Sequence, residues 1–279
     1  MADPPLAPTG RADCSLRAEE AHVGVEPAEH SVDPLNANNQ AGCHEVTGEG
    51  YNKKQGTKMT NYSPNMLKTF KSCPVKYKFK YEDKISLPQK SSFFEKGKKV
   101  HALANYYLQG LDVSKLEPTL NEDEQRAWQM LKANEFFNKT YVNSEYNLSC
   151  KVGDYWIGGR LDALVKDVAQ NSTNATECYY ILDYKTGSIP QNPEYDYQTM
   201  VYLLCLSNSP IVKEGDEIKF VYIDLKNDDN YVIDFTPERK VEYEKAIVEI
   251  CEKIENAQLP EEIEHSKSCD FCEFKKICL

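Results

Sequence analysis

The sequence predicts an α/β fold in which helices flank a mixed central β-sheet of about five strands. Two observations indicate this class: apolar runs with the two-residue period of strands alternate with apolar patterns of helical period, and turn residues separate them. The chain has 279 residues, 41% of them hydrophobic, which is enough to bury the core of one large domain or two small ones. We expect one folded domain over residues 59–279.

The first 50 residues differ sharply from the rest of the chain. They hold nine acidic and two basic residues and lack Lys, Tyr, Phe, Ile and Trp. Such a segment buries too little apolar surface to offset the entropy that is lost on ordering. We therefore expect residues 1–58 to be a disordered acidic tail, with the domain starting near Met59.

Capping residues mark the ends of the predicted helices. Ser63 followed by Pro64 is typical of a helix start, and Gly110 of a helix end. Asn121 and Glu124 have the spacing of a capping box. After the short helix at Pro64, helices are predicted over 92–109, 121–139, 195–206 and 237–258, and strands over 144–151, 155–167, 178–185, 217–225 and 231–235.

Composition also bears on location and chemistry. The chain has no run of 18 apolar residues, so it predicts no membrane span. Its first residues lack the basic and apolar regions of a secretory signal, and we expect a cytoplasmic protein. Ten cysteines in that compartment would stay reduced, where clustered cysteines favour metal binding over disulfides.

The net charge of −11 argues at first against a nucleic-acid partner. However, ten lysines and only three acidic residues lie between Lys68 and Lys99, with aromatic residues interleaved. Such a segment suits the backbone and bases of a nucleic acid, although a solvated helix face explains it equally well. The candidate DNA-binding residues are Lys76, Lys78, Lys80, Lys98 and Lys99.

The strand predicted at 178–185 ends in an acid and a lysine two residues apart. Because side chains alternate along a strand, Asp183 and Lys185 leave the same face. The carboxylate can bind a divalent cation, and the lysine can hold a phosphate or the attacking water. Taken alone the pair is weak evidence, since most such pairs are solvated edge charges.

A second acid, Asp162, lies among apolar residues in the preceding strand. A carboxylate in that setting is costly to bury unless it is paired or bound to a metal. Pairing of the two strands would bring Asp162 next to Asp183. The alternative is an ion pair between Asp162 and Arg160 at a hairpin edge.

Helices could complete this site. His101 follows Gly97 by one turn on the same face, and the glycine leaves room for another group to approach. A histidine above two aspartates gives a nitrogen and oxygen ligand set for Mn²⁺ or Mg²⁺, but a lone helical histidine is more often structural or exposed. Gln198 and Tyr202 lie four residues apart on the helix that follows, where they could orient the lysine or a phosphate, or simply pack.

The chain ends in a C-x₂-C-x₅-C pattern formed by Cys269, Cys272 and Cys278. Structural metal sites take four ligands, and Cys73, between a helix and the basic segment, is exposed enough to be the fourth. The other cysteines after the tail lie within apolar patterns and are expected in the core; they are Cys150, Cys178, Cys205 and Cys251.

Taken in order, these motifs resemble those of the PD-(D/E)XK nuclease superfamily. They are Cys73-Pro74, the Gly97–His101 element, Gly159-Arg160-Leu161-Asp162, Asp183-Tyr184-Lys185-Thr186-Gly187, the Gln198–Tyr202 pair and the terminal cysteine triplet. Over residues 60–279 the chain is most similar to the RecB-like group with an iron–sulfur cluster, which includes CRISPR-associated single-strand exonucleases and AddB-type nuclease domains. It departs from the superfamily pattern in having Leu161 where a proline precedes the first acid, and in having no helicase motif.

The resemblance implies a restriction-endonuclease-like core and a role for each matching residue. The Mg²⁺ or Mn²⁺ ligands would be His101, Asp162, Asp183 and the Tyr184 backbone carbonyl; Lys185 would be the catalytic lysine; Gln198 and Tyr202 match the helix motif, and Glu145 more loosely an upstream acid. Cys73, Cys269, Cys272 and Cys278 would bind a [4Fe–4S] cluster that joins the two ends of the domain. The spacing alone suits zinc equally.

We therefore expect a metal-dependent deoxyribonuclease, an exonuclease on single-stranded or unwound DNA in repair, recombination or foreign-DNA processing. A helicase or a CRISPR-adaptation protein would be its partner. Two alternatives are a catalytically inactive DNA-binding module that keeps a structural cluster, and a zinc-stabilised interaction protein. The intact set of two aspartates and a lysine favours the enzyme.

Overall fold

The computed structural model describes residues 61–87, 97–168, 176–258 and 267–278. All of the described residues belong to one compact unit, residues 56–279. The predicted acidic tail, residues 1–58, lies outside the described residues.

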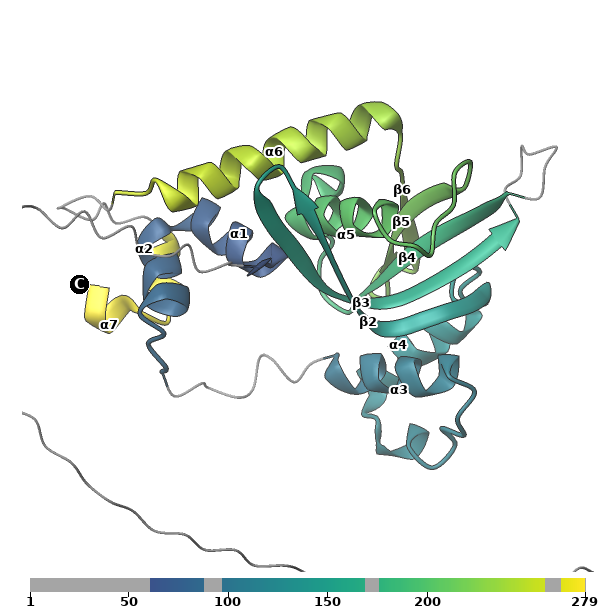
Figure 1. Ribbon diagram of the computed structural model, residues 1–279. Coiled ribbons are helices and arrows are strands. Elements are labelled where there is room, and N and C mark those ends of the chain that lie inside the picture. The colour runs from purple at the N-terminus through teal and green to yellow at the C-terminus, as the bar shows by residue number, and fades with distance from the viewer. Residues whose placement is uncertain (1–60, 88–96, 169–175, 259–266, 279) are drawn as a thin grey trace, which may run out of the picture. The chain divides into compact units, whose positions relative to one another are not determined.

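A mixed sheet forms the centre of the described domain (Figure 1). Its strands are β1 (Asn61–Tyr62), β2 (Thr140–Val152), β3 (Tyr155–Val168), β4 (Glu177–Lys185), β5 (Glu217–Asp224) and β6 (Asp229–Asp234). The order is β1-β3-β4-β5-β6, with β2 also paired to β3. The β1–β3 and β4–β5 pairs are parallel, and the β2–β3, β3–β4 and β5–β6 pairs are antiparallel. All five predicted strands are present; the sequence missed β1, which is only two residues long.

The helices are α1 (Pro64–Ser72), α2 (Pro74–Tyr77), α3 (Lys98–Leu108), α4 (Glu122–Ala133), α5 (Tyr197–Ser207), α6 (Pro237–Glu255) and α7 (Lys275–Cys278). Shorter turns cover Lys78–Glu82 (π-helical) and Glu117–Thr119, Pro193–Tyr195 and Lys267–Phe271 (3₁₀). None of the helices among the described residues is long and apolar enough to cross a membrane.

The predicted caps are confirmed. The Ser63 hydroxyl accepts a hydrogen bond from the Met66 amide at 3.3 Å, and Pro64 is the first residue of α1. Asn121 and Glu124 make both hydrogen bonds of a capping box at the start of α4. These bonds satisfy amide groups that have no partner within the first turn of a helix.

Three predicted helices were too long, and the last of them, predicted to reach residue 258, ends at Glu255. The helix predicted over 92–109 begins at Lys98, because Gly97 has a φ of +93°, which is outside the helical region; residues 92–96 are not described. The helix predicted to reach residue 139 ends at Ala133. There the Asn134 side chain accepts a hydrogen bond from the Phe136 amide at 3.0 Å and turns the chain.

The hydrophobic core lies on both faces of the sheet. Along β4, Tyr179 and Ile181 pack in a cluster with α1, α5 and α6, whereas Tyr180 and Leu182 pack in a second cluster with α3 and α4. Figure 1 shows α5 and α6 on one side of the sheet and α3 and α4 on the other. This alternation follows the two-residue period of the strand and explains why β4 reads as a continuous apolar run. All four cysteines predicted in the core are buried there.

Candidate active site

The site is built at the end of β4, where the neighbouring strand brings a second carboxylate. Ala163 of β3 pairs with Leu182 of β4, so Asp162 and Asp183 follow at the next positions of the antiparallel pair. The Tyr184 amide donates a hydrogen bond to Asp162 Oδ2 at 3.3 Å. The predicted strand pairing is therefore confirmed, and it holds two acids together at one edge of the site.

Asp183 and Lys185 lie on the same face, as the strand period predicts. The Lys185 ammonium is 2.6 Å from Asp183 Oδ2. Gln198, in the first turn of α5, donates from its amide to Asp183 Oδ1 and accepts from Lys185 Nζ at 3.4 Å. Gln198 thus bridges the acid and the lysine and fixes the direction of both side chains.

His101, on α3, approaches the end of β4 from the face of the sheet opposite to α5 and Gln198. Its Nδ1 is 3.3 Å from Asp162 Oδ2, and its Nε2 is 3.1 Å from the Tyr184 carbonyl oxygen. Burial acts to lower the pKa of His101, but the hydrogen bond and charge of Asp162 outweigh it and raise that pKa above its usual value. Helices from both faces therefore converge on the end of β4.

Asp183 is the most deeply buried acid of the site, with 3% of its surface exposed. Burial raises its pKa, the nearby Asp162 raises it further, and Lys185 partly opposes both. Its Oδ2 lies beside the Lys185 ammonium but makes no well-aligned hydrogen bond to any described residue. Two crowded carboxylates with an unsatisfied oxygen are the kind of donor set that a divalent cation stabilises.

Gly97 was predicted to leave room beside His101 for another group to approach, and the group that approaches is the Thr186 side chain. A Cβ atom at Gly97 would lie 2.7 Å from Thr186 Oγ1, so the loop after β4 fills that space. The glycine is required for close packing and for its left-handed backbone. By this close contact with Thr186, Gly97 fixes where α3, and hence His101, lies against the end of β4.

Tyr202 does not reach the two acids or the lysine. Its hydroxyl donates to the Arg160 carbonyl at 2.7 Å, and its ring packs where a Cβ atom of Gly159 would be, 2.7 Å from Tyr202 Cε1. It therefore supports the backbone of β3 just before Asp162. The alternative ion pair of Asp162 with Arg160 is not observed, because Arg160 Nε lies 2.8 Å from Glu145 Oε2.

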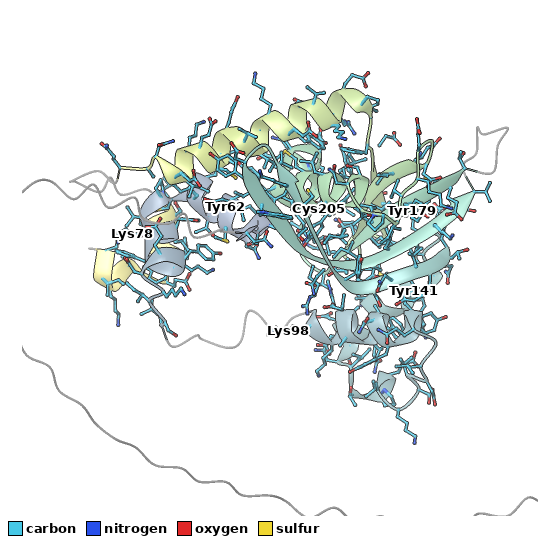
Figure 2. All side chains as sticks on the ribbon, in the orientation of Figure 1. Tyr62, Lys78, Lys98, Tyr141, Tyr179 and Cys205 are labelled. Carbon is cyan, nitrogen blue, oxygen red and sulfur yellow. The ribbon has the colours of Figure 1, made fainter. Side chains whose placement is uncertain are left out.

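A cleft of about 610 Å³ opens beside His101 and Asp162. Of the five lysines predicted to bind DNA, Lys98 lines this cleft (labelled in Figure 2). Lys99 instead lies 3.6 Å from Glu124 Oε2. Lys76, Lys78 and Lys80 lie on α2 and the π-helical turn, where they contact Glu273, Asp83 and the Tyr81 ring respectively. The basic segment is thus divided between the cleft and the cysteine-containing end of the domain.

The four predicted cluster cysteines lie in one neighbourhood. Burial, followed by the charges of Cys73, Cys272 and Cys269, raises the pKa of Cys278. Two contacts join the segments that carry them: Lys76 lies 3.5 Å from Glu273, and the rings of Phe79 and Phe274 are 5.7 Å apart. The structure therefore brings the start of the domain to its C-terminal cysteines.

Neither the side chains at the end of β4 nor the four cysteines have the closed geometry of a metal site. Among the residues that the structure describes, no three His, Cys, Asp or Glu side chains form a ready ligand set. At the end of β4, His101 is directed at Asp162 and the Lys185 ammonium lies against Asp183. The donor types nevertheless suit Mg²⁺ or Mn²⁺, since they are carboxylate, carbonyl and imidazole groups.

Among the cleft residues that were not predicted from the sequence are a polar and an aromatic side chain, Asn105 and Tyr106. Both lie on α3, four and five residues after His101. The i,i+4 spacing from the predicted histidine could have identified Asn105, whereas Tyr106, at i+5, gives no such signal.

Residues 61–279 match the family described as "PD-(D/E)XK nuclease superfamily". Among solved structures, a proposed exonuclease from Eubacterium rectale is 14% identical with a TM-score of 0.47, covering 82% of this chain and 93% of its own. A protein called SSO0001 is 20% identical with a TM-score of 0.38, covering 78% and 85% respectively. No curated protein gives a significant match. The family match spans the whole sheet and every residue of the site, and the chain belongs to the PD-(D/E)XK nuclease superfamily.

Proposed function

We propose that this protein is a divalent-metal-dependent deoxyribonuclease that removes nucleotides from the ends of single-stranded or unwound DNA. The observation that carries the proposal is the arrangement of Asp162, Asp183 and Lys185 at the end of one strand pair. Membership of a nuclease superfamily supports the reaction class. A role in repair, recombination or foreign-DNA processing, beside a helicase or a CRISPR-adaptation protein, belongs to the same proposal.

The cation-binding groups would be His101, the two aspartates and the Tyr184 carbonyl oxygen. His101 lies 3.3 Å from Asp162 Oδ2 and 3.1 Å from that carbonyl oxygen, and strand pairing places Asp183 beside Asp162. A bound Mg²⁺ or Mn²⁺ supplies an acidified water and neutralises charge on the phosphate oxygens. Hydrolysis joins the oxygen of water to phosphorus, breaks one P–O bond of the strand, and leaves a proton on the departing oxygen.

Lys185 performs the other part of this chemistry. Its ammonium group has three donors, and Asp183 and Gln198 hold it at the strand end. From there it can donate to the attacking water or to a phosphate oxygen and offset the negative charge that develops. Gln198 acts as a positioning residue, because its amide orients the lysine and the acid together.

A second part of the proposal concerns the cysteines. The shared neighbourhood of Cys73, Cys269, Cys272 and Cys278 supports one metal centre that joins the two ends of the domain. We assign it to a [4Fe–4S] cluster of the RecB-like group, with zinc as the alternative for four thiolates. We also propose that residues 1–58 are a tail that takes no part in the reaction.

A nuclease assay with Mn²⁺ tests the proposal. Wild-type protein should degrade an end-labelled single strand and spare a circular one. Lys185→Ala and Asp183→Ala should each lower the rate by at least about 10²–10³-fold, as expected for loss of a positioned catalytic charge. Lys166→Ala is the matched control, because Lys166 is also ion-paired on this sheet but lies at the far end of the β3–β4 pair. Cleavage of the circle would contradict exonuclease action, and near-normal turnover of Lys185→Ala would remove the nuclease assignment.

A further inference from the structure

We propose that the cleft beside His101 is a subsite for one unpaired nucleotide, whose base stacks on Tyr106 and whose phosphate is held by Arg160 and Lys98. This inference rests on the proposed function and names the substrate feature that the site selects. It concerns the region next to the reacting phosphate rather than the groups that carry out hydrolysis.

Tyr106 offers the stacking surface. It lies on α3, lines the cleft and is 42% exposed. The next residue, Tyr107, packs against Trp128 and Phe137 with ring centroids 5.5 and 5.8 Å apart. Because the buried Val100, Leu103 and Ala104 anchor α3 in the core, Tyr106 is held beside the cleft on a rigid element. Aromatic side chains on rigid elements are the usual platforms for unpaired bases.

Two cationic side chains, Arg160 and Lys98, line the same cleft as Tyr106. Arg160 is 63% exposed, and its Nε is 2.8 Å from Glu145 Oε2, which leaves its terminal amino groups for a ligand. Lys98 makes no ion pair with any residue that the structure describes, and it lines the same cleft. Guanidinium and ammonium groups at such positions bind phosphate oxygens.

Asn105 adds a directed polar group. Its Oδ1 accepts from the Ser144 hydroxyl at 2.6 Å and from Gln109 Nε2 at 2.8 Å. Its Nδ2 makes no hydrogen bond with a described residue. Since Asn105 lines the cleft, this amide donor is fixed in direction and available to a base or a phosphate.

The shape and chemistry favour a single strand. A cleft of about 610 Å³ is within the range that accepts a ligand of nucleotide size, and it is far too small for a duplex. A base inside a duplex has both faces covered by its stacked neighbours, so it cannot stack on Tyr106 without leaving the helix. Tyr106 should therefore contribute to binding of a frayed or single-stranded end and not to binding of paired DNA.

Fluorescence anisotropy tests this subsite without any need for cleavage. A short fluorescein-labelled thymidine oligonucleotide, alone or in a duplex, is titrated with the full chain carrying Lys185→Ala, in the presence of Mn²⁺. Adding Tyr106→Ala should weaken single-strand binding by about tenfold, the loss expected for one base–aromatic stack, and leave duplex binding unchanged. Tyr106→Phe should keep the affinity because the ring is retained.

The matched control is Trp156→Ala. Trp156 is 37% exposed on β3, near the end away from Asp162. Its loss should not alter binding of either DNA. Equal weakening by Tyr106→Ala and Trp156→Ala, or an equal loss for single strand and duplex with Tyr106→Ala, would overturn the subsite.

A spectroscopic readout detects the stack itself. An oligonucleotide with 2-aminopurine at its terminal nucleotide should lose fluorescence on binding to the wild-type ring and to Tyr106→Phe, but not on binding to Tyr106→Ala. Quenching that persists in Tyr106→Ala would contradict stacking on this residue. If wild-type protein binds in this way but never cleaves, the nuclease proposal fails while the subsite stands; if it cleaves but Tyr106 has no effect, the reverse holds.

Discussion

The end of β4 and the cysteine-containing end of the domain hold their functional side chains in different ways. At the end of β4, strand register alone places Asp162 beside Asp183, and helices from both faces add His101 and Gln198. The cysteines instead come from two short helical segments at opposite ends of the domain, and all four are only half-buried. The first arrangement is made by the fold, whereas the second would be completed by what it binds.

This difference has an energetic cause. Cys73 and Cys269 are 196 residues apart in the sequence, so bringing them together costs considerable chain entropy. Contacts between the two segments include a partly exposed ion pair and one aromatic pair, which stabilise weakly. A bound metal centre would add its binding energy to the folding energy of this region.

Removing a proposed cluster ligand should cause the largest change in metal content and stability. Cys73→Ala should lose the metal centre, lower the melting temperature and reduce the yield, because metal binding here stabilises the closed chain. Anaerobically purified wild-type protein should be brown, with broad absorbance near about 400 nm and about four irons per chain. Iron analysis and thermal unfolding make the measurement.

Cys150→Ala is the control for this prediction, since Cys150 is buried in the core among apolar residues. It should lose some stability but keep its iron. Colourless wild-type protein with one zinc per chain would contradict the iron–sulfur assignment and leave the site at β4 untouched.

The pH dependence of stability tests the end of β4, where the fold alone holds two carboxylates close together. Burial and the nearby Asp162 raise the pKa of Asp183 from 3.8 to about 6. A raised carboxyl pKa means that the folded state binds the proton more tightly than the unfolded state, so metal-free protein loses stability as pH rises through this interval. The loss should be at most about 3 kcal/mol, from the size of the shift.

Asp183→Asn cannot ionise and should not show this loss. Denaturant unfolding of both proteins in EDTA at several pH values measures the difference. The stability of Asp183→Asn should therefore rise relative to wild type between about pH 4 and pH 6. A constant difference across that range would mean that Asp183 is not strained by its neighbours.

The two glycines that flank α3, Gly97 and Gly110, test how firmly the fold positions His101. Gly97 and Gly110 both have positive φ, +93° and +75°, so alanine at either should cost about 1–2 kcal/mol of stability. At Gly97 the new Cβ atom would also meet Thr186, whereas at Gly110 nothing lies within 4 Å. Gly97→Ala should therefore also reduce cleavage, and Gly110→Ala should not. Equal activity of the two variants would show that His101 does not depend on this packing.

Removal of the N-terminal segment should have the smallest effect. Protein starting at Met59 should keep its melting temperature and nuclease rate, because residues 1–50 contain no Tyr, Phe, Ile or Trp to form a core. Calorimetry and the end-labelled assay compare it with the full chain. A substantial drop in either quantity would show that this segment docks on the domain.

The sequence correctly predicted the strands, the caps and the placement of Asp162, Asp183 and Lys185 together at the end of β4, because each rests on a local period. Asp183 and Lys185 are two residues apart on one strand, and Asp162 needed only the pairing of neighbours along the chain. What it missed depends on contacts between distant segments. The packing of Gly97 against Thr186 is one example, and the bond from Tyr202 to the backbone of β3 is another. The periodicity of the sequence does not predict contacts between segments that lie far apart along the chain.

Calorimetric titration of Mn²⁺ tests the central claim, that the end of β4 is a metal site in which Asp183 is a ligand and Lys185 is not. Wild-type protein and Lys185→Ala should each bind Mn²⁺ at this site, and Asp183→Ala should lose that binding event, while both variants lose cleavage. Equal Mn²⁺ binding by all three proteins would contradict the account.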